Sequence, residues 1–408
     1  MPSRPGPGEN AVNRLSARDG TLRRVVDALP GFGDSPAVLT LSGEQTTHLS
    51  YRALSDQIAR LGAGLIERGL EKGGRVAILA PNGPAWIAVC LAVVDAGGIV
   101  VPIDSALDED SLRHVLADSA PRLAFVGTEE RERVESLLPQ GCRMIALDGE
   151  DDSPDWQSVM NAEPAERPAL EPEDPAVLFY TSGTTGPPKG VPLSHRNLLF
   201  ELHGLLDIGL MAPGERLLLP LPLHHVYPFV VGMLASLIYG VGIVLPQSMT
   251  GPHIVQAIRA CDVATVIGVP RLYDALLSGV IARVEESGWA PRLLFRGLLR
   301  ISRSARRRLG LRLGSRLFRA LHRRIGPRLR LLASGGAALD EDLAWSLEAL
   351  GWTVATGYGL TETAPLLTIV APGDTRFDTA GKPIPGVEVR IAPLESGDTE
   401  PEADESDS

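Results

Sequence analysis

The sequence predicts an α/β protein with a mostly parallel sheet, because short apolar runs of strand length alternate with stretches of helical periodicity. The strand-like runs are AVLTL, RVAILAPN, IVVPID and LAFVG, and the helical stretches are SYRALSDQIARLGAGLIERGL, WIAVCLAVVDAG and SLRHVLADS. Ser50 is a candidate N-cap of the first helix, and Gly97 closes the second. Strands joined by helices form parallel sheets covered on both faces. The 408 residues, 44% of them hydrophobic, are enough for a large core.

Charge and cysteine content argue against several classes of function. The formal net charge of −11 argues against a nucleic-acid partner. Cys90, Cys142 and Cys261 lie far apart in the sequence, with no C-x-x-C pair, so they predict a reducing cytoplasm and no zinc site. The first residues, MPSRPGPGEN, lack the apolar segment of a secretion signal. Residues 1–20 are rich in proline, glycine and polar side chains, which predicts a disordered N-terminus.

The most informative stretch is YTSGTTGPPKGVPLSHRN, residues 180–197. It follows the apolar run PAVLFY, which predicts a buried strand, and it leads into an apolar helix. Its glycines let backbone N–H groups approach a ligand, its hydroxyl groups add donors, and its lysine adds a positive charge. Such a loop is suited to wrapping phosphate oxygens. The candidate contacts are Thr181, Ser182, Gly183, Thr184, Thr185, Gly186 and Lys189.

This loop differs from the common P-loop of nucleotide-binding proteins. Only two residues separate Gly183 from Gly186, and Gly190 follows the lysine where the P-loop has a magnesium-binding Ser or Thr. Any metal must therefore be held by groups elsewhere in the chain.

The segment resembles the signature phosphate loop of the adenylate-forming superfamily, which includes acyl-CoA synthetases, peptide-synthetase adenylation domains and luciferases. The resemblance implies that ATP, Mg²⁺ and a carboxylic acid are used to form an acyl-adenylate, with CoA as the acceptor in the synthetases. It also implies a large domain over residues 21–392. That domain would have two stacked α/β subdomains, layered αβαβα, and a small partial β-barrel subdomain.

A second specific match is TGYGLTET, residues 356–363. Tyr358 provides a ring that can stack on adenine, Thr361 a hydroxyl for the phosphates, and Glu362 the oxygen ligand that Mg²⁺ prefers. The resemblance assigns the metal to Glu362, with Thr181 near it. It also adds two residues to the ATP contacts, Thr356 and Gly357.

The segment LLASGGAAL, residues 331–339, predicts a strand that runs into a turn of small residues. In the family the matching segment lies between the adenosine and the acyl group. This implies that Gly335 and Gly336 contact ATP and that Gly336 and Ala337 contact the acyl group. The alternative is an ordinary strand-to-helix turn with Asp340 as N-cap.

The segment PLPLHHVYP, residues 220–228, carries two adjacent histidines. The family's matching His-Val segment borders the acyl site, which implies that His225 is a catalytic residue that orients or gates the carboxylate. His224 stands where the family often has an aromatic residue, so the register of the pair stays open. A histidine satisfied in the core is the alternative. Farther on, FDTAGKPIPGVEVRI predicts a turn before a strand VEVRI, within the family's small β subdomain.

Two stretches raise the question of membrane contact. Residues 229–246 are an uncharged run of borderline length for a membrane span, but glycines interrupt it and favour a buried helix followed by a strand. Residues 292–330 hold fourteen arginines and no acidic residue. A basic amphipathic helix there would lie on the anionic inner face of a membrane or form a solvated face of the protein.

The end of the chain has no counterpart in the family. Residues 393–408 contain seven acidic and no basic residues, which predicts a disordered tail. The family's C-terminal lid, with its second lysine, is missing, so we expect slow turnover unless a separate chain carries the lid. Three functions follow: a long-chain fatty acyl-CoA ligase, an acyl-AMP ligase that feeds a carrier protein, and a catalytically silent scaffold protein.

Overall fold

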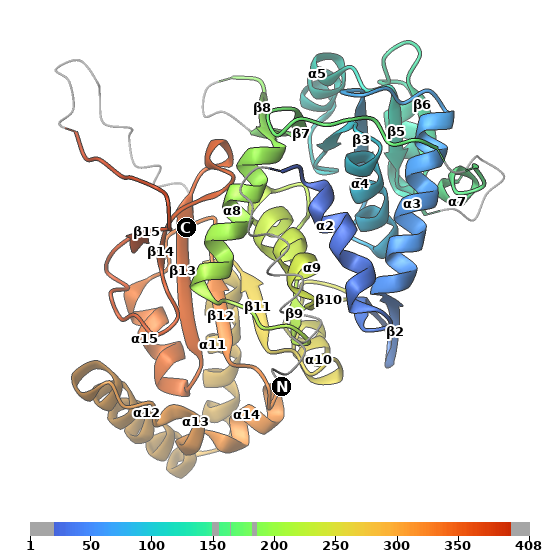
Figure 1. The fold of residues 1–408 in the computed structure, drawn as a ribbon. Helices are drawn as coiled ribbons and strands as arrows, with labels where there is room; N and C mark the ends of the chain where they lie inside the picture. The colour runs from blue at the N-terminus through green and yellow to red at the C-terminus, as the bar shows by residue number, and fades with distance from the viewer. Residues whose placement is uncertain (1–19, 149–154, 164, 182–185, 393–408) are drawn as a thin grey trace, which may run out of the picture.

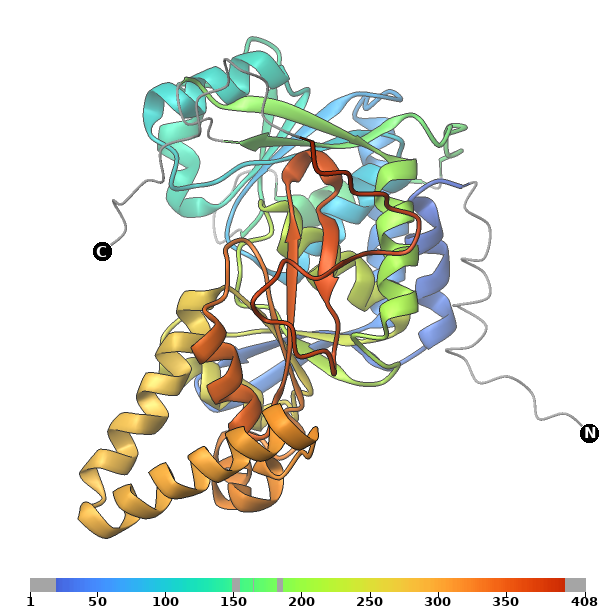
Figure 2. The same ribbon diagram turned by 90° about the vertical axis from the view of Figure 1, so that its left-hand side faces the viewer.

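The computed structural model describes residues 20–148, 155–163, 165–181 and 186–392. Two mostly parallel sheets lie one above the other, with helices between them and on both outer faces (Figures 1 and 2). The predicted disordered N-terminus and acidic tail lie outside the described residues, apart from Gly20.

The smaller sheet has six strands in the order β6-β5-β3-β4-β7-β8. All neighbours are parallel except β7 and β8, which pair antiparallel. The strands are β3 (Arg75–Leu79), β4 (Ile99–Pro102), β5 (Leu123–Val126), β6 (Arg143–Ala146), β7 (Pro175–Thr181) and β8 (Lys189–Ser194).

The larger sheet has nine strands in the order β15-β14-β13-β12-β11-β9-β10-β1-β2. Its six central strands run parallel, and β2, β14 and β15 are antiparallel at the edges. The strands are β1 (Pro36–Ser42), β2 (Gln45–Ser50), β9 (Arg216–Leu218), β10 (Gly242–Leu245), β11 (Thr265–Gly268), β12 (Leu331–Ser334), β13 (Thr353–Gly359), β14 (Leu366–Val370) and β15 (Lys382–Pro383).

Alternate side chains on the strands assign the helices to three layers, because successive residues of a strand point to opposite faces of a sheet. On β3, Ile78 packs into the middle core and Ala77 into the outer core of the smaller sheet. On β10, Ile243 faces the middle core and Val244 the outer core of the larger sheet. The order of layers is therefore αβαβα, as predicted.

The helices follow this division. The middle layer and its edge contain α2 (Arg23–Ala28), η1 (Leu29–Phe32), α3 (Tyr51–Glu67), α4 (Pro84–Asp95), α7 (Trp156–Val159), α8 (His195–Ile208), the π-helix η3 (Pro228–Leu234) and α9 (Ala235–Tyr239). Outside the smaller sheet lie α5 (Glu109–Ser119), η2 (Thr128–Glu130) and α6 (Arg131–Glu135). Outside the larger sheet lie α10 (Gly251–Ala260), α11 (Pro270–Glu286), α12 (Trp289–Leu309), α13 (Gly314–Leu317), α14 (Arg319–Ile325) and α15 (Glu341–Leu350).

Most element predictions are confirmed. Ser50 caps α3 by accepting from the backbone N–H of Ala53 at 3.2 Å, and Ser194 forms a capping box at the start of α8. Residues 229–246 form η3, α9 and β10, and no helix in the described part of the chain is long and apolar enough to cross a membrane.

The predicted strand VEVRI is wrong. Residues 387–391 take no strand conformation, and the short strand β15 precedes the Pro385–Gly386 turn instead of following it. Glu388, Val389, Arg390 and Ile391 are exposed, so no sheet neighbour supports this segment. At this end of the fold the β structure consists of β13–β15, which extend the larger sheet.

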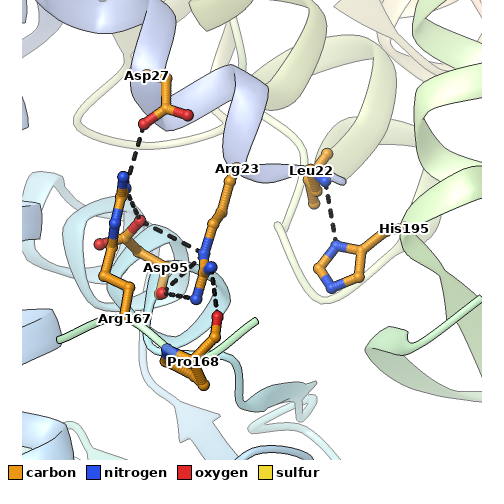
Figure 3. Close-up of polar contacts among 7 residues, drawn as sticks. All are labelled: Leu22, Arg23, Asp27, Asp95, Arg167, Pro168 and His195. Atoms are coloured by element: carbon orange, nitrogen blue, oxygen red, sulfur yellow. Dashed lines mark hydrogen bonds and ion pairs between the residues drawn. The ribbon is translucent and has the colours of Figure 1, made fainter. Parts of the chain in front are cut away.

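A partly buried polar cluster around the buried Asp95 joins α2 to α4 and to the chain before β7 (Figure 3). Arg23 donates from Nε and Nη2 to the backbone oxygen of Asp95, at 3.0 and 2.6 Å, and from Nη1 to that of Pro168 at 2.6 Å. Arg167 donates to the Asp95 carboxylate at 2.8 Å and also pairs with Asp27. Burial lowers the pKa of the Arg23 guanidinium, while its hydrogen bond to Asp95 raises that of Arg167. The Asp95 carboxylate therefore compensates two guanidinium groups.

Replacing Asp95 with alanine should lower the free energy of unfolding by about 3 kcal/mol, because Arg23 and Arg167 both lose the buried carboxylate that compensates their charge. Urea denaturation measures this change. The control is Asp34→Ala, which removes a surface pair with Arg52 whose side chains are 64% and 82% exposed. It should cost less than about 0.5 kcal/mol. If both variants lost the same free energy of unfolding, the cluster around Asp95 would stabilise the fold no more than a surface ion pair does.

Candidate active site

A pocket of about 790 Å³ opens where the carboxyl ends of strands from both sheets meet. Ligands of open α/β sheets bind at this edge of the strands, so the pocket is the candidate active site. Its polar lining consists of Asp104 after β4, Tyr180 and Thr181 on β7, His224 and His225 after β9, Gly335 and Gly336 after β12, Gly357 and Tyr358 on β13, and Thr361 and Glu362 of η4 (Thr361–Thr363).

The β7–β8 pair frames the predicted phosphate loop. Thr181 lines the pocket and is the ladder partner of Lys189, so the two ends of the loop lie side by side. The Lys189 side chain is exposed and lies outside the pocket lining, as does Gly186. Four predicted contacts lie outside the described residues: Ser182, Gly183, Thr184 and Thr185.

Helix α5 holds this pair of strands in place. The Tyr180 hydroxyl donates to the Asp118 carboxylate at 2.6 Å, and burial raises the pKa of Tyr180. His114 Nε2 lies 3.0 Å from the backbone oxygen of Pro188, at the other end of the loop. Both ends of the loop are therefore attached to a rigid helix.

The turn after β12 is shaped by close contact with a tyrosine. A Cβ added at Gly335 would lie 3.0 Å from the Tyr227 ring, whose hydroxyl donates to the backbone oxygen of Ala333 at 2.9 Å. Gly336 has φ of +79°, a conformation that glycine adopts without strain. Ala337 is exposed and does not line the pocket.

The predicted N-cap that follows this turn is confirmed. Asp340 caps α15 by accepting from the backbone N–H of Leu343 at 2.8 Å. The contacts of Gly335, Gly336 and Ala337 with ATP and the acyl group stay predictions.

Tight backbone contacts fix the segment that carries Glu362. A Cβ at Gly359 would lie 1.7 Å from the backbone oxygen of Pro365, so only glycine fits there. The Thr363 hydroxyl accepts from the backbone N–H of Leu360 at 2.9 Å and donates to the oxygen of Pro365 at 2.7 Å. This loop packs against β8, so Glu362 belongs to an element beside the strand that begins at Lys189.

The histidine segment is held by an asparagine of the smaller sheet. Asn82, after β3, donates from Nδ2 to the backbone oxygen of Leu221 at 2.8 Å and accepts from the N–H of Leu223 at 2.9 Å. This clamp sets the backbone just before His224 and His225. Both histidines line the pocket, which rules out a histidine enclosed in the core.

The environment keeps the two imidazoles neutral at pH 7. Their ring centroids lie 4.3 Å apart, and His224 Nε2 lies 3.6 Å from the Asp104 carboxylate. Desolvation and the neighbouring His225 lower the pKa of His224 to about 4, against the opposing effect of Asp104. Desolvation also lowers the pKa of His225. Neutral rings can each donate one hydrogen bond and accept another.

The donor set fits a magnesium ion bound together with a nucleotide. Mg²⁺ in such sites takes one or two carboxylates with phosphate oxygens and water. Glu362 provides the carboxylate and Thr181 a hydroxyl within the same pocket. In the part of the chain that the structure describes, no group of three or more His, Cys, Asp or Glu side chains could hold a metal alone.

Of the twelve predicted residues that the structure describes, eight line the pocket. Lys189, Gly186, Ala337 and Thr356 lie outside its lining, although Thr356 is on the strand that carries Tyr358. Three residues that shape the site were not predicted from the sequence: Asp104, Asn82 and Tyr227. The signal for Asp104 was present, since it directly follows an apolar strand and so lies at the edge where ligands bind.

Comparison with known proteins agrees with the fold. The family model for AMP-binding enzymes matches residues 27–405. A long-chain-fatty-acid–CoA ligase of Mycobacterium bovis is 29% identical over 378 residues, and a feruloyl-CoA synthase of Amycolatopsis is 31% identical over 348 residues. In each case 85% of this chain and 61% of the relative are covered. The N-terminal domain of FACL13 from Mycobacterium tuberculosis has the same fold, with a TM-score of 0.70 over 90% of this chain and 83% of that one, at 20% identity.

The chain therefore belongs to the AMP-binding enzyme family. It spans 61% of the length of the two relatives.

At the first residue of α8, His195 attaches the helix that follows the phosphate loop to the N-terminal segment (Figure 3). It is 1% exposed, and its Nδ1 accepts from the backbone N–H of Leu22 at 3.1 Å. Burial lowers the pKa of His195 to about 4, with Asp174 opposing the shift and Arg23 adding to it. The His195 imidazole is therefore neutral in the folded protein at pH 7.

A His195→Asn variant tests this linkage. The depressed pKa predicts that His195 contributes stability above about pH 6.5, and that this contribution is lost as the pH falls toward 4. Asparagine keeps an acceptor for Leu22 but does not titrate. Urea denaturation measures the free energy of unfolding at pH 7 and at pH 5. Between these two pH values the variant should lose about 1–2 kcal/mol less than the parent. The control, His48→Asn at an exposed position of β2, should keep the parent's pH dependence. Identical curves for parent and His195→Asn would contradict the assignment.

Proposed function

We propose that this protein activates a carboxylic acid with ATP and transfers the acyl group to CoA. The observation that carries the proposal is one pocket lined by Thr181 at the start of the phosphate loop, Tyr358, Glu362 and His225. The names of two family relatives, a fatty-acid–CoA ligase and a feruloyl-CoA synthase, support it.

Two steps account for the reaction. A carboxylate oxygen of the acid attacks the α-phosphorus of ATP, and the bond from this phosphorus to the bridging oxygen breaks, so pyrophosphate leaves. The CoA thiol then loses its proton and attacks the acyl carbonyl carbon, and AMP leaves with the electrons of the C–O bond. Negative charge grows on phosphate oxygens in the first step, so positive charge and hydrogen-bond donors there accelerate it.

The residues fit distinct parts of the substrates. Tyr358, 51% exposed, offers a ring face to adenine, and the Gly335–Gly336 turn allows close approach of the nucleotide. Lys189, at the start of β8 beside the pocket residue Thr181, would supply positive charge to the phosphate oxygens. Glu362 and Thr181 would hold Mg²⁺, which neutralises phosphate charge when bound. A neutral His225 can donate one N–H to the acid's carboxylate and so orient it.

For the acid we propose a long-chain fatty acid. The support is the long-chain ligase among the relatives and the apolar side chains of the pocket wall, Ile103, Leu107, Phe179 and Val269. An acyl-AMP ligase that feeds a carrier protein would form acyl-AMP but no acyl-CoA. A silent scaffold protein would form neither product.

Lys189→Ala and Glu362→Ala should each abolish the thermal stabilisation that ATP·Mg²⁺ gives the parent. At an ATP concentration 100 times Kd, that stabilisation is about 2.7 kcal/mol. Each variant should also release pyrophosphate about 10²- to 10³-fold more slowly. Lys382→Ala is the matched control, because Lys382 is an exposed lysine of β15 outside the pocket. Unchanged ATP stabilisation in both site variants would place the nucleotide elsewhere.

We also propose that α12 contacts an anionic membrane surface from the cytoplasmic side. Much of its arginine content is explained by the fold: Arg303 pairs with Asp342, and Arg306 pairs with Glu348 at 2.7 Å in a buried site. These pairs support the solvated-face interpretation for part of the helix. Its exposed apolar side chains have no such explanation and suit a lipid surface beside Arg300 and Arg308, which form no ion pair among the described residues. They are Trp289, Leu293, Leu294, Ile301 and Leu309, between 59% and 79% exposed.

Replacing Leu293 and Leu294 together with glutamine should weaken binding to vesicles that contain phosphatidylglycerol by about tenfold or more, because two exposed leucines lose their contact with lipid. Vesicle sedimentation measures the effect. Ile391→Gln, at a position 94% exposed but far from α12 in the sequence, should bind like the parent. If the parent itself does not sediment with the vesicles, α12 is a solvated face.

A further inference from the structure

A second cavity, of about 830 Å³, lies on the outer face of the larger sheet, between α10, α11 and α14. We call it the α10–α14 groove. Among the described residues it shares no lining residue with the active-site pocket. Its base is formed by buried apolar side chains, Ile254, Val280, Phe318 and Ile325, and Phe295 of α12 closes one side. A volume of this size is typical of small-molecule sites.

The charged residues of the groove gather at one end. Arg259, Arg283 and Arg324 line it, each in the last turn of its helix. Helices α10 and α11 begin just after the carboxyl ends of β10 and β11, and α14 ends just before β12, so the last turns of all three helices lie away from the carboxyl edge of the sheet. No carboxylate lines the groove, and none of the three arginines forms an ion pair among the described residues.

The opposite end of the groove is apolar. Met249 precedes α10, and Leu272 lies in the first turn of α11. Between Leu272 and Ser287 the groove follows about 22 Å of helix at 1.5 Å per residue. A long, narrow apolar floor with positive charge at one end matches an extended single chain with an anionic head group.

We propose that the α10–α14 groove binds a free single-chain carboxylate, with its hydrocarbon chain on the apolar floor and its head group at the three arginines. The arginine end is the end remote from the active-site pocket. A carboxylate held there is turned away from the phosphate loop, so the groove is a separate binding site and not the site where an acid is activated. The proposal rests on the groove alone and not on the proposed reaction.

Gly279 offers a way to fill the groove without disturbing the fold. It lies inside α11 and lines the groove, and a Cβ added there meets no atom within 4 Å. Gly279→Phe should therefore occupy the groove, and it replaces a poor helix former. Gly297→Phe is the matched control, because Gly297 lies inside α12, outside the groove lining, and has the same open space.

The test uses the full chain and hexadecanoate that carries a photoreactive diazirine near its methyl end. Irradiation followed by peptide mapping should label residues 249–276. Gly279→Phe should reduce this labelling about tenfold or more, and Gly297→Phe should leave it unchanged. Arg283→Gln with Arg324→Gln should weaken competition by unlabelled hexadecanoate about tenfold, since each lost charged hydrogen bond has a large effect. Competition by hexadecanol should not change.

Several outcomes overturn the proposal. Labels confined to the active-site pocket, or labelling that survives in Gly279→Phe, would mean that the groove does not bind the acid. Hexadecanol competing as strongly as hexadecanoate in the parent would show that the arginines do not recognise the head group. Labelling that requires phosphatidylglycerol vesicles would assign the groove to membrane lipid instead. Because no outcome depends on ATP or on turnover, failure here is distinct from failure of the proposed reaction.

Discussion

The site depends on one constraint of parallel sheets: strands that run in the same direction end at the same edge. Strands β4 and β7 of the smaller sheet and β12 of the larger sheet deliver Asp104, Thr181 and Gly335 to one pocket. The strands themselves carry the apolar core, so polar groups collect in the segments just after them. The antiparallel strand β14 returns alongside β13, and the loop between these two strands, which carries Glu362, packs against β8.

Buried polar contacts hold the layers in the arrangement that this pocket needs. Asp95 compensates two arginines that join the N-terminal helix to the smaller sheet, and Arg306 with Glu348 attaches the long helix α12 to α15. Glu348 also accepts from the backbone N–H of Val354 at 2.9 Å, so this pair reaches the strand that carries Tyr358. Removing one partner of such a pair leaves a buried charge without compensation, which gives these contacts influence over a distant site.

Local patterns account for much of what could be predicted. Glycines and hydroxyl groups between PAVLFY and an apolar helix indicated a phosphate loop. In the structure β7 precedes this loop, and β8 and α8 follow it. Ser50 and Ser194 signalled helix starts through their own side chains. The strand VEVRI was predicted from alternation alone, but a strand requires a hydrogen-bonded neighbour, and no strand among the described residues pairs with residues 387–391.

The succession of strands and helices along the chain, the apolar periodicity and the residue types of the two motifs were thus set by local sequence, because they depend on neighbours within a few positions. What the tertiary structure decided is which residues meet. Asn82 clamps the segment before His224 from 139 and 141 residues away, and Tyr227 closes on Gly335. The neutrality of the two histidines and the arginine end of the α10–α14 groove likewise come from contacts between distant segments. Desolvation and charge depend on the whole surroundings of a group, which no local pattern contains.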